Sequence, residues 1–290
     1  MTQIVTSLAE ISDRYDVVLC DLWGCVHNGR QAFPEAIKAL QAFRAKGGTV
    51  VMLTNAPRAR AYVAAQLDRL GVPRDAWDVI TTSGDSARAA MFTGAVGQKV
   101  YFIGYESDLT FFEPLNIIDT PLEITRVPLK EAEGIVCCGP EDPYADPAVY
   151  RADFLYAKQM GMKLLCANPD VIVDVGEKRQ WCAGALAQLY TEMGGQSLYF
   201  GKPHPPIYDL ARRRLTAMGK DVPPHRILCI GDGIVTDVAG AMSEDLDALF
   251  ITGGLAAEET KTTVQPDPAA LNAYLETQSY DPAYAIGFLR

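Results

Sequence analysis

The sequence lacks the features that mark nucleic-acid-binding, secreted and membrane proteins. Its 26 Lys and Arg are outnumbered by 36 Asp and Glu, giving a net charge of −10, whereas a nucleic-acid surface needs clustered positive charge. The start of the chain has no basic segment followed by a long apolar run, as a signal peptide would. No stretch approaches the ~20 apolar residues of a membrane helix. We therefore expect a cytoplasmic protein that binds neither nucleic acid nor membranes.

Cysteine is present, but without a pairing pattern. The seven cysteines are an odd number and include no C-x-x-C pair. Several lie in apolar, strand-like runs, so buried and reduced thiols are expected. The adjacent Cys137 and Cys138 could form a metal or redox pair, but nothing near them in the sequence supports this.

Short apolar runs alternate with helical patterns along the chain, which is typical of a parallel α/β sheet. With 290 residues and 49% hydrophobic content, the chain can bury one large core or two smaller ones. Pro34 is expected to open the first helix and Gly47 to end it. Strands are expected at residues 16–20, 49–53, 79–80, 198–200, 226–230 and 248–251, and helices at 34–46, 58–70, 183–193, 206–218 and 268–275.

A second α/β series, with strands at 99–103, 135–138 and 163–166, interrupts the first. It lies between segments that must meet in space, so it is interpreted as an inserted domain. The expected division is a discontinuous core of residues 1–94 and 182–260, an inserted domain of residues 95–181, and a tail of residues 261–290 without a chemical signal.

Four short polar segments follow predicted strands, where open α/β sheets place their ligands. Asp21 directly follows the first strand and could be a nucleophile, although Asp ends many strands. Thr54 and Asn55 follow the second strand and could donate to phosphate oxygens. A helix N-cap explains them equally well in isolation.

The other two segments add a cation and two carboxylates. Lys202 lies in a proline-rich turn and could neutralise charge on a transferring phosphoryl group; the alternative is a solvated surface charge. Asp232 and Asp237, five residues apart after a strand, could hold magnesium directly and through water. A Gly-Asp turn with a helix-terminal Asp is the alternative.

Together the four segments resemble the four motifs of the haloacid dehalogenase-like phosphatases. The insertion between the second and third motifs is similar to that of class IIA, the NagD-like group, and residues 81–85 and 252–254 also fit that group. The resemblance covers roughly residues 14–260. It implies an α/β, Rossmann-like parallel-sheet core with an inserted α/β cap domain of the C2 type.

The resemblance also implies a mechanism, that of a phosphoric monoester hydrolase. Asp21 would attack phosphorus and form an aspartyl-phosphate. Mg²⁺ would be held by Asp21, the backbone carbonyl of Trp23, Asp232 and waters oriented by Asp237. The substrate would be a small phosphorylated metabolite, such as a sugar phosphate or nucleotide.

Phosphate binding and substrate selection are implied in the same way. Thr54, Asn55, Lys202 and the Gly24 N–H would hold the phosphate oxygens. Asn168 and Asp170 resemble a recurrent motif of the cap, so they either face the substrate or shape a turn. Homodimers formed through the cap are common among relatives, so a homodimer is a further possibility.

One position departs from the family pattern. The acid/base Asp that usually follows the nucleophile by two residues is replaced by Trp23, and an indole cannot accept a proton. His27 is the candidate substitute because its pKa lies near neutrality; the alternative is a hydrogen bond within its loop.

Two function classes therefore stay open. The first is a phosphatase, and the second is a weakened relative that binds a phosphorylated metabolite in a regulatory role. A dinucleotide-binding oxidoreductase is disfavoured, because the segment at Gly231 and Gly233 lacks the G-x-G-x-x-G spacing.

Overall fold

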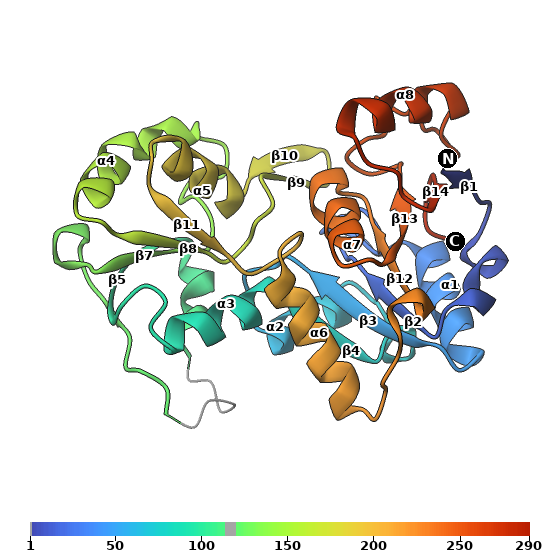
Figure 1. The fold of residues 1–290 in the computed structure, drawn as a ribbon, viewed down its shortest axis with the longest axis horizontal. Coiled ribbons are helices and arrows are strands. Elements are labelled where there is room, and N and C mark those ends of the chain that lie inside the picture. The colour runs from blue at the N-terminus through green and yellow to red at the C-terminus, as the bar shows by residue number, and fades with distance from the viewer. Residues whose placement is uncertain (1, 114–119) are drawn as a thin grey trace.

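Two parallel sheets organise the chain in a computed structural model that describes residues 2–113 and 120–290. A seven-stranded core sheet has the order β1-β14-β13-β12-β2-β3-β4, and a five-stranded sheet has the order β11-β8-β7-β5-β6. Figure 1 shows them as two lobes, with the core on the right. The expected α/β class with a parallel-sheet core and an α/β insertion is confirmed.

The bounds of the elements are as follows. The core strands are β1 (Gln3–Ile4), β2 (Val17–Cys20), β3 (Thr49–Thr54), β4 (Val79–Thr82), β12 (Ile227–Gly231), β13 (Asp247–Ile251) and β14 (Tyr284–Ile286). The strands of the insertion are β5 (Lys99–Ile103), β6 (Thr125–Arg126), β7 (Gly134–Cys137), β8 (Lys163–Cys166), β11 (Gln196–Tyr199) and the antiparallel pair β9 (Ile172–Val175) and β10 (Lys178–Trp181). The helices are α1 (Pro34–Ala45), α2 (Arg60–Arg69), α3 (Ser83–Phe92), α4 (Arg151–Gln159), α5 (Ala183–Glu192), α6 (Pro205–Ala217), α7 (Ala239–Ser243) and α8 (Pro268–Gln278).

The central strands of the core are buried on both faces, as parallel sheets require. β2 and β3 are buried along their whole length. Alternate side chains go to opposite faces: Val18 packs in the cluster that holds α1, whereas Val17 packs in the cluster that holds α6. The near-continuous apolar runs that predicted these strands follow from this double burial.

The expected domain boundary at residue 182 is wrong. The helix α5 packs on the second sheet, and β11 pairs in parallel with β8 there. The inserted domain therefore contains the strands from β5 through β11, and the chain returns to the core only after Tyr199. Helix and strand patterns look the same in both domains, so the sequence did not show which sheet these two elements complete.

The expected separate tail is also wrong. The strand β14 lies between β1 and β13 in the core sheet. The helix α8 packs through Leu271 and Leu275 against Phe250 of β13. The segment after residue 260 is thus an integral part of the core.

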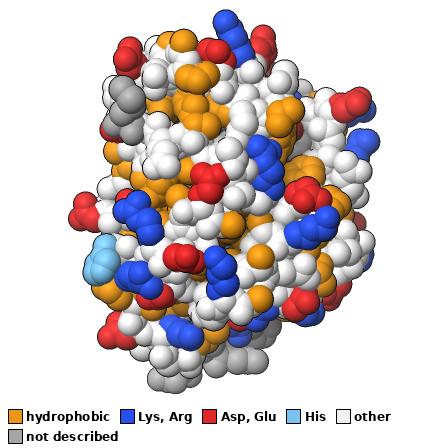
Figure 2. All heavy atoms as spheres, turned by 90° about the vertical axis from the view of Figure 1, so that its right-hand side faces the viewer, with side chains coloured by type: hydrophobic (Ala, Val, Ile, Leu, Met, Phe, Trp, Pro, Cys, Tyr) orange, Lys and Arg blue, Asp and Glu red, His pale blue; other side chains and the backbone are white. Residues whose placement is uncertain are grey.

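All seven cysteines are buried and free of disulfides, as expected. Within residues 2–113 and 120–290, no helix combines the length and apolarity needed to cross a membrane. On the core face drawn in Figure 2, Lys and Arg side chains are interspersed with Asp and Glu among the coloured residues.

Candidate active site

Three polar segments meet at one edge of the core sheet because their strands are parallel neighbours. β2 pairs with β12 on one side and with β3 on the other. Asp21 therefore follows β2 between Asp232, which follows β12, and Asn55, which follows β3. The Asp21 N–H donates to the carbonyl of Ile230 at 2.8 Å, which fixes the backbone at this edge.

Lys202 reaches this edge from the segment that leads out of the inserted domain into α6. Its Nζ lies 2.7 Å from Oδ1 of Asp21 and 2.6 Å from Oδ1 of Asp237. The Lys202 side chain is only 3% exposed, so the solvated-charge alternative does not apply. A single buried ammonium thus contacts two buried carboxylates.

The charges at this edge do not balance among the protein groups. Burial raises the pKa of Asp232 well above its ordinary value, and the nearby negative charges of Asp21 and Asp237 add to this. Burial also raises the pKa of Asp21, against the effect of Lys202, and raises that of Asp237 to about 6. For Lys202, burial alone would lower the pKa, but the surrounding carboxylates outweigh it and raise the pKa well above its ordinary value. The cluster therefore needs more positive charge than Lys202 supplies.

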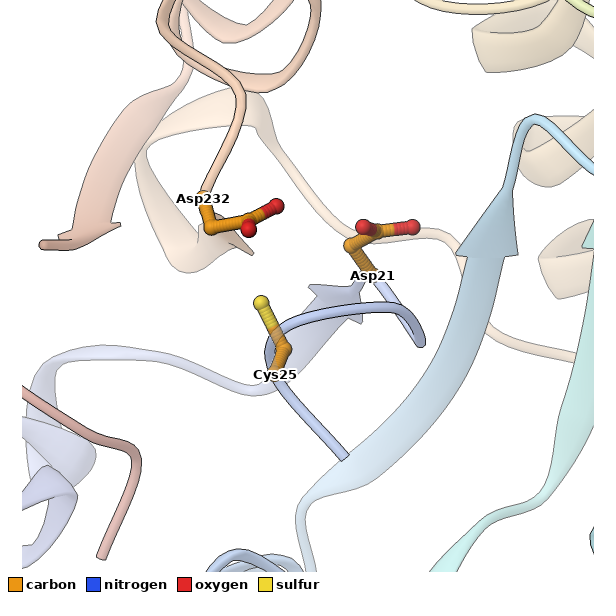
Figure 3. A group of neighbouring side chains, drawn as sticks. All are labelled: Asp21, Cys25 and Asp232. Carbon is orange, nitrogen blue, oxygen red and sulfur yellow. The ribbon is translucent and has the colours of Figure 1, made fainter. Parts of the chain in front are cut away.

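Two of these carboxylates are close enough to share a cation. One ligand atom each of Asp21, Asp232 and Cys25 lies within 4.8 Å of the others. In Figure 3 the Asp232 carboxylate points toward Asp21, and the Cys25 sulfur points toward Asp232. Burial raises the pKa of the Cys25 thiol well above its ordinary value, so the two oxygen donors, which suit Mg²⁺, are the available charged ligands.

The Asp232 side chain has room because two neighbouring residues are glycines, which have no Cβ. A Cβ on Gly24 would come within 2.1 Å of Oδ2 of Asp232, and a Cβ on Gly254 within 2.0 Å of the same atom. Gly24 also has φ +72°, which favours glycine. The turn at residues 252–254 thus lies against Asp232, as Gly24 does. The excess negative charge, the oxygen donors and this cradle fit a divalent cation.

Asp237 is held by the protein through both oxygens. Its Oδ1 accepts from Lys202, and its Oδ2 accepts from the Gly233 N–H at 3.1 Å. A Cβ on Gly231 would lie 2.0 Å from Cγ of Asp237. This arrangement fits an outer-sphere role for Asp237, consistent with the expected water-mediated contact.

Asn55 connects the core to the inserted domain. Its Nδ2 donates to Oδ1 of Asp170 at 2.8 Å, and its Oδ1 accepts from the Lys202 N–H at 2.7 Å. Asn168 accepts from the Asp170 N–H through its side chain, so it shapes the turn. Burial raises the pKa of Asp170 to about 6. Asn55 therefore positions Lys202 and Asp170 instead of presenting free donors, which differs from its expected role.

Thr54 and Gly24 also differ in part from expectation. The Thr54 side chain is buried, and its Oγ1 accepts from the Ala56 N–H at 3.2 Å. The Gly24 N–H donates to the backbone carbonyl of His27 at 3.0 Å. Both contacts are made within the protein and do not show how a phosphate would bind. Phosphate binding by these two residues therefore stays a prediction.

His27 is not placed to replace the missing acid/base. It is 1% exposed, and its Nδ1 accepts from the Gly29 N–H at 3.1 Å. Its ring packs edge-on against Trp23, with centroids 5.0 Å apart. Burial lowers the pKa of His27 to about 4. The structure therefore shows His27 in a hydrogen bond within its own loop.

A cavity of about 220 Å³ opens beside Asp21 and Asp232. Trp23 and Asp170 line it, and so does Phe288 from the segment after β14. Sequence patterns gave no indication of Phe288, because only the folding of β14 into the core sheet brings it there. The turn at Gly254 is part of the family resemblance in the sequence, but its contact with Asp232 could not be predicted.

Comparison with known proteins agrees with this site. A family model described as "Haloacid dehalogenase-like hydrolase" matches residues 18–118, and a second, described as "HAD-hyrolase-like", matches residues 199–276. The crystal structure of a haloacid dehalogenase-like hydrolase from Brucella suis 1330 is 38% identical and covers 99% of this chain and 100% of its own, with a TM-score of 0.86.

Two further relatives have names that state an activity. The ribonucleotide monophosphatase NagD of Escherichia coli K12 is 25% identical over 240 residues, 82% of this chain and 88% of its own. The glycerol phosphate phosphatase of Mycobacterium tuberculosis, solved with magnesium, is 24% identical, with a TM-score of 0.64 over 92% of this chain and 75% of its own. From the matching family models and the Brucella suis relative, together with the site geometry, the chain belongs to the haloacid dehalogenase-like hydrolases, in the NagD-like class IIA.

Proposed function

We propose that the protein is a Mg²⁺-dependent phosphatase that hydrolyses a small phosphorylated metabolite through an aspartyl-phosphate on Asp21. The observation that carries this proposal is the position of the Asp21 carboxylate, which lies 2.7 Å from Lys202 and within 4.8 Å of an Asp232 oxygen. A nucleophile flanked by a cation on one side and a carboxylate for a metal on the other suits phosphoryl transfer. The phosphatase names of NagD and of the magnesium-bound glycerol phosphate phosphatase support it.

The chemistry proceeds in two displacements. An oxygen of Asp21 forms a bond to phosphorus while the ester P–O bond breaks, and the leaving oxygen keeps the electron pair of that bond. Water then attacks the phosphorus of the aspartyl-phosphate, which releases inorganic phosphate and restores the Asp21 carboxylate. Lys202 stabilises the negative charge that develops on the phosphoryl oxygens.

Mg²⁺, when bound, would neutralise the repulsion between the nucleophile and the phosphate. Asp21, Asp232 and the backbone carbonyl of Trp23 would hold it, with Asp237 orienting its waters. Trp23 lines the same cavity as these carboxylates, which supports its inclusion.

The alternative function, binding of a phosphorylated metabolite without turnover, rests on one observation. At the usual position of the acid/base the chain has Trp23, and His27 is buried with its Nδ1 already bonded. Proton transfer to the leaving group is typically worth ~10²–10⁴ in rate. Its loss slows esters whose leaving group needs a proton, but spares those that leave as stable anions.

Release of inorganic phosphate from acetyl phosphate, with and without Mg²⁺, tests the proposal. We expect Mg²⁺-dependent turnover in the wild type and none in Asp21→Asn. Beryllium fluoride should form an adduct on Asp21. No turnover of acetyl phosphate, together with normal binding of Mg²⁺ and phosphate, would favour the binding protein.

A further inference from the structure

A second cavity of about 300 Å³ adjoins the one at Asp21. Trp23, Asp170 and Val173 line both, so these side chains form the boundary between the two spaces. Its other walls include the segment after β3, the segment before the 3₁₀ helix at Glu106–Phe112, the segment after β7, and the end of β10. The second cavity therefore lies between the core and the inserted domain and adjoins the cavity that the nucleophile lines.

Aromatic side chains occupy three of its walls. Trp23 separates it from the first cavity, Tyr105 lines it before the 3₁₀ helix, and Trp181 lines it from β10. Tyr105 and Trp181 are each 37% exposed, which leaves much of both side chains uncovered. Flat aromatic faces left uncovered in a cavity are typical of sites that bind an apolar or aromatic group.

The two cavities differ in charge. Acidic side chains predominate among the charged residues of the first cavity. Their negative charge repels any negatively charged part of a substrate that neither the metal nor Lys202 contacts. The acidic residues are Asp21, Asp170, Asp174, Asp232 and Asp237. Among the described residues that line the second cavity, Arg58 is the one cation, and it pairs with Asp108 at 3.4 Å. The other carboxyl group there, Asp170, is shared with the first cavity and accepts from Asn55. The first cavity thus suits the metal and the phosphoryl group, and the second suits an uncharged ring.

We propose that the leaving group of the substrate is a planar aromatic ring, held in the second cavity among Trp23, Tyr105 and Trp181. This inference rests on the proposed function and names its substrate class, an aryl phosphate. Trp23 then has two effects. It replaces the acid/base Asp of the family, and its side chain lines the cavity that holds the ring.

The chemistry of such a substrate agrees with the missing acid. When the ester P–O bond breaks, a phenolic oxygen keeps the electron pair as a phenolate, whose conjugate acid has a pKa of about 10, like tyrosine. It leaves without receiving a proton in the transition state and takes one from water afterwards. An alkyl alcohol is a far weaker acid and needs the proton that neither Trp23 nor His27 can give.

Binding of two phosphonates, measured by calorimetry with Mg²⁺ present, tests ring recognition without any turnover. Benzylphosphonate has the shape of phenyl phosphate with CH₂ in place of the ester oxygen, and cyclohexylmethylphosphonate is its saturated counterpart. We expect the aromatic ligand to bind roughly 3- to 10-fold more tightly, the range of one aromatic contact. Trp181→Ala should reduce this ratio to less than about twofold, and Tyr105→Ala, a second variant, should also reduce it.

The matched control is Leu155→Ala, which truncates a half-exposed apolar residue of the same domain on α4. It should leave the ratio unchanged. Equal binding of the two phosphonates by the wild type would overturn the inference, and so would a ratio that survives in both variants.

Turnover of acetyl phosphate, which has no ring, separates this inference from the proposed function. Leu155→Ala, the matched control, should hydrolyse it as fast as the wild type. If the wild type does not hydrolyse acetyl phosphate, the proposed function fails, whereas the phosphonate ratio still decides whether the cavity selects a ring.

Discussion

Lys202 and Asp21, which flank the inserted domain in sequence, form an ion pair with 2.7 Å between Nζ and Oδ1. The two residues lie on opposite sides of the insertion in sequence, so its two ends must come together at the core sheet. Because Lys202 also contacts Asp237, it is the protein's own counterion for the nucleophile and for a neighbouring carboxylate.

Lys202→Met should therefore destabilise the fold. Removing one partner from a buried ion pair typically costs ~3–5 kcal/mol. Mg²⁺ should raise the melting temperature of this variant more than that of the wild type, because it would compensate the same carboxylates. Thermal unfolding with and without Mg²⁺ measures both effects. Lys38→Met, which removes an exposed pair with Glu35, is the control and should change little.

Asp232→Asn should weaken Mg²⁺ binding because one of the two charged ligands is lost. The loss should exceed the roughly 10- to 100-fold typical of an outer-sphere partner. Titration calorimetry measures it directly. Equal affinity in the wild type and the variant would remove Asp232 from the ligand set.

Gly254→Ala tests the cradle around Asp232 without changing any charge. The new Cβ would lie 2.0 Å from Oδ2, so the carboxylate must move. We expect Mg²⁺ affinity to fall by roughly 10- to 100-fold, as when a ligand loses its support. Gly139→Ala is the matched control, because a Cβ there meets nothing within 4 Å. If both variants bind Mg²⁺ like the wild type, the turn at Gly254 does not set the position of Asp232.

Trp23→Asp should raise turnover of alkyl phosphates by restoring an acid at the usual position, with an upper range of ~10²–10⁴. The competing effect is loss of the indole, which can cost ~3–5 kcal/mol in stability. Rates for an alkyl phosphate and for p-nitrophenyl phosphate are compared at a temperature at which the variant stays folded. Brisk hydrolysis of alkyl phosphates by the wild type would show that the missing acid has been replaced by another group.

His27 should make stability depend on pH. Its pKa falls from 6.5 to about 4 on folding, so between these values the unfolded state binds more protons. The contribution of His27 to the free energy of unfolding is complete above pH 6.5. It decreases by about 3 kcal/mol as the pH falls toward 4. His27→Asn, which retains an acceptor, should flatten this part of the profile in urea unfolding at a series of pH values. An unchanged profile would show that His27 is not the group responsible.

The sequence predicted the core strands well because their pattern follows from burial on both faces. The core strands expected at 16–20 and 49–53 lie at Val17–Cys20 and Thr49–Thr54 in the structure. The convergence of Asp21, Asn55 and Asp232 could also be predicted, since parallel neighbouring strands end at one edge. Lys202 follows β11 of the other sheet, so only the family resemblance indicated its place at this edge.

Features that depend on three-dimensional packing could not be predicted. The pattern of β11 is compatible with either sheet, and only its pairing with β8 assigns it to the inserted domain. The burial of His27 depends on how its loop folds against Trp23. Tyr105 and Trp181 lie on segments far apart in sequence, so their common cavity has no sequence signal.

The position of β14 has a consequence for the order of folding during synthesis. The inserted sheet uses only strands between Lys99 and Tyr199, so all of it can leave the ribosome before the core is complete. The core sheet needs β14, because β1 pairs with it and not with β13. Domains generally fold as units while the chain is being made. The inserted domain, which lies second in sequence, can therefore fold first, whereas β1, the first strand of the chain, finds its partner only when residues 284–286 have been made.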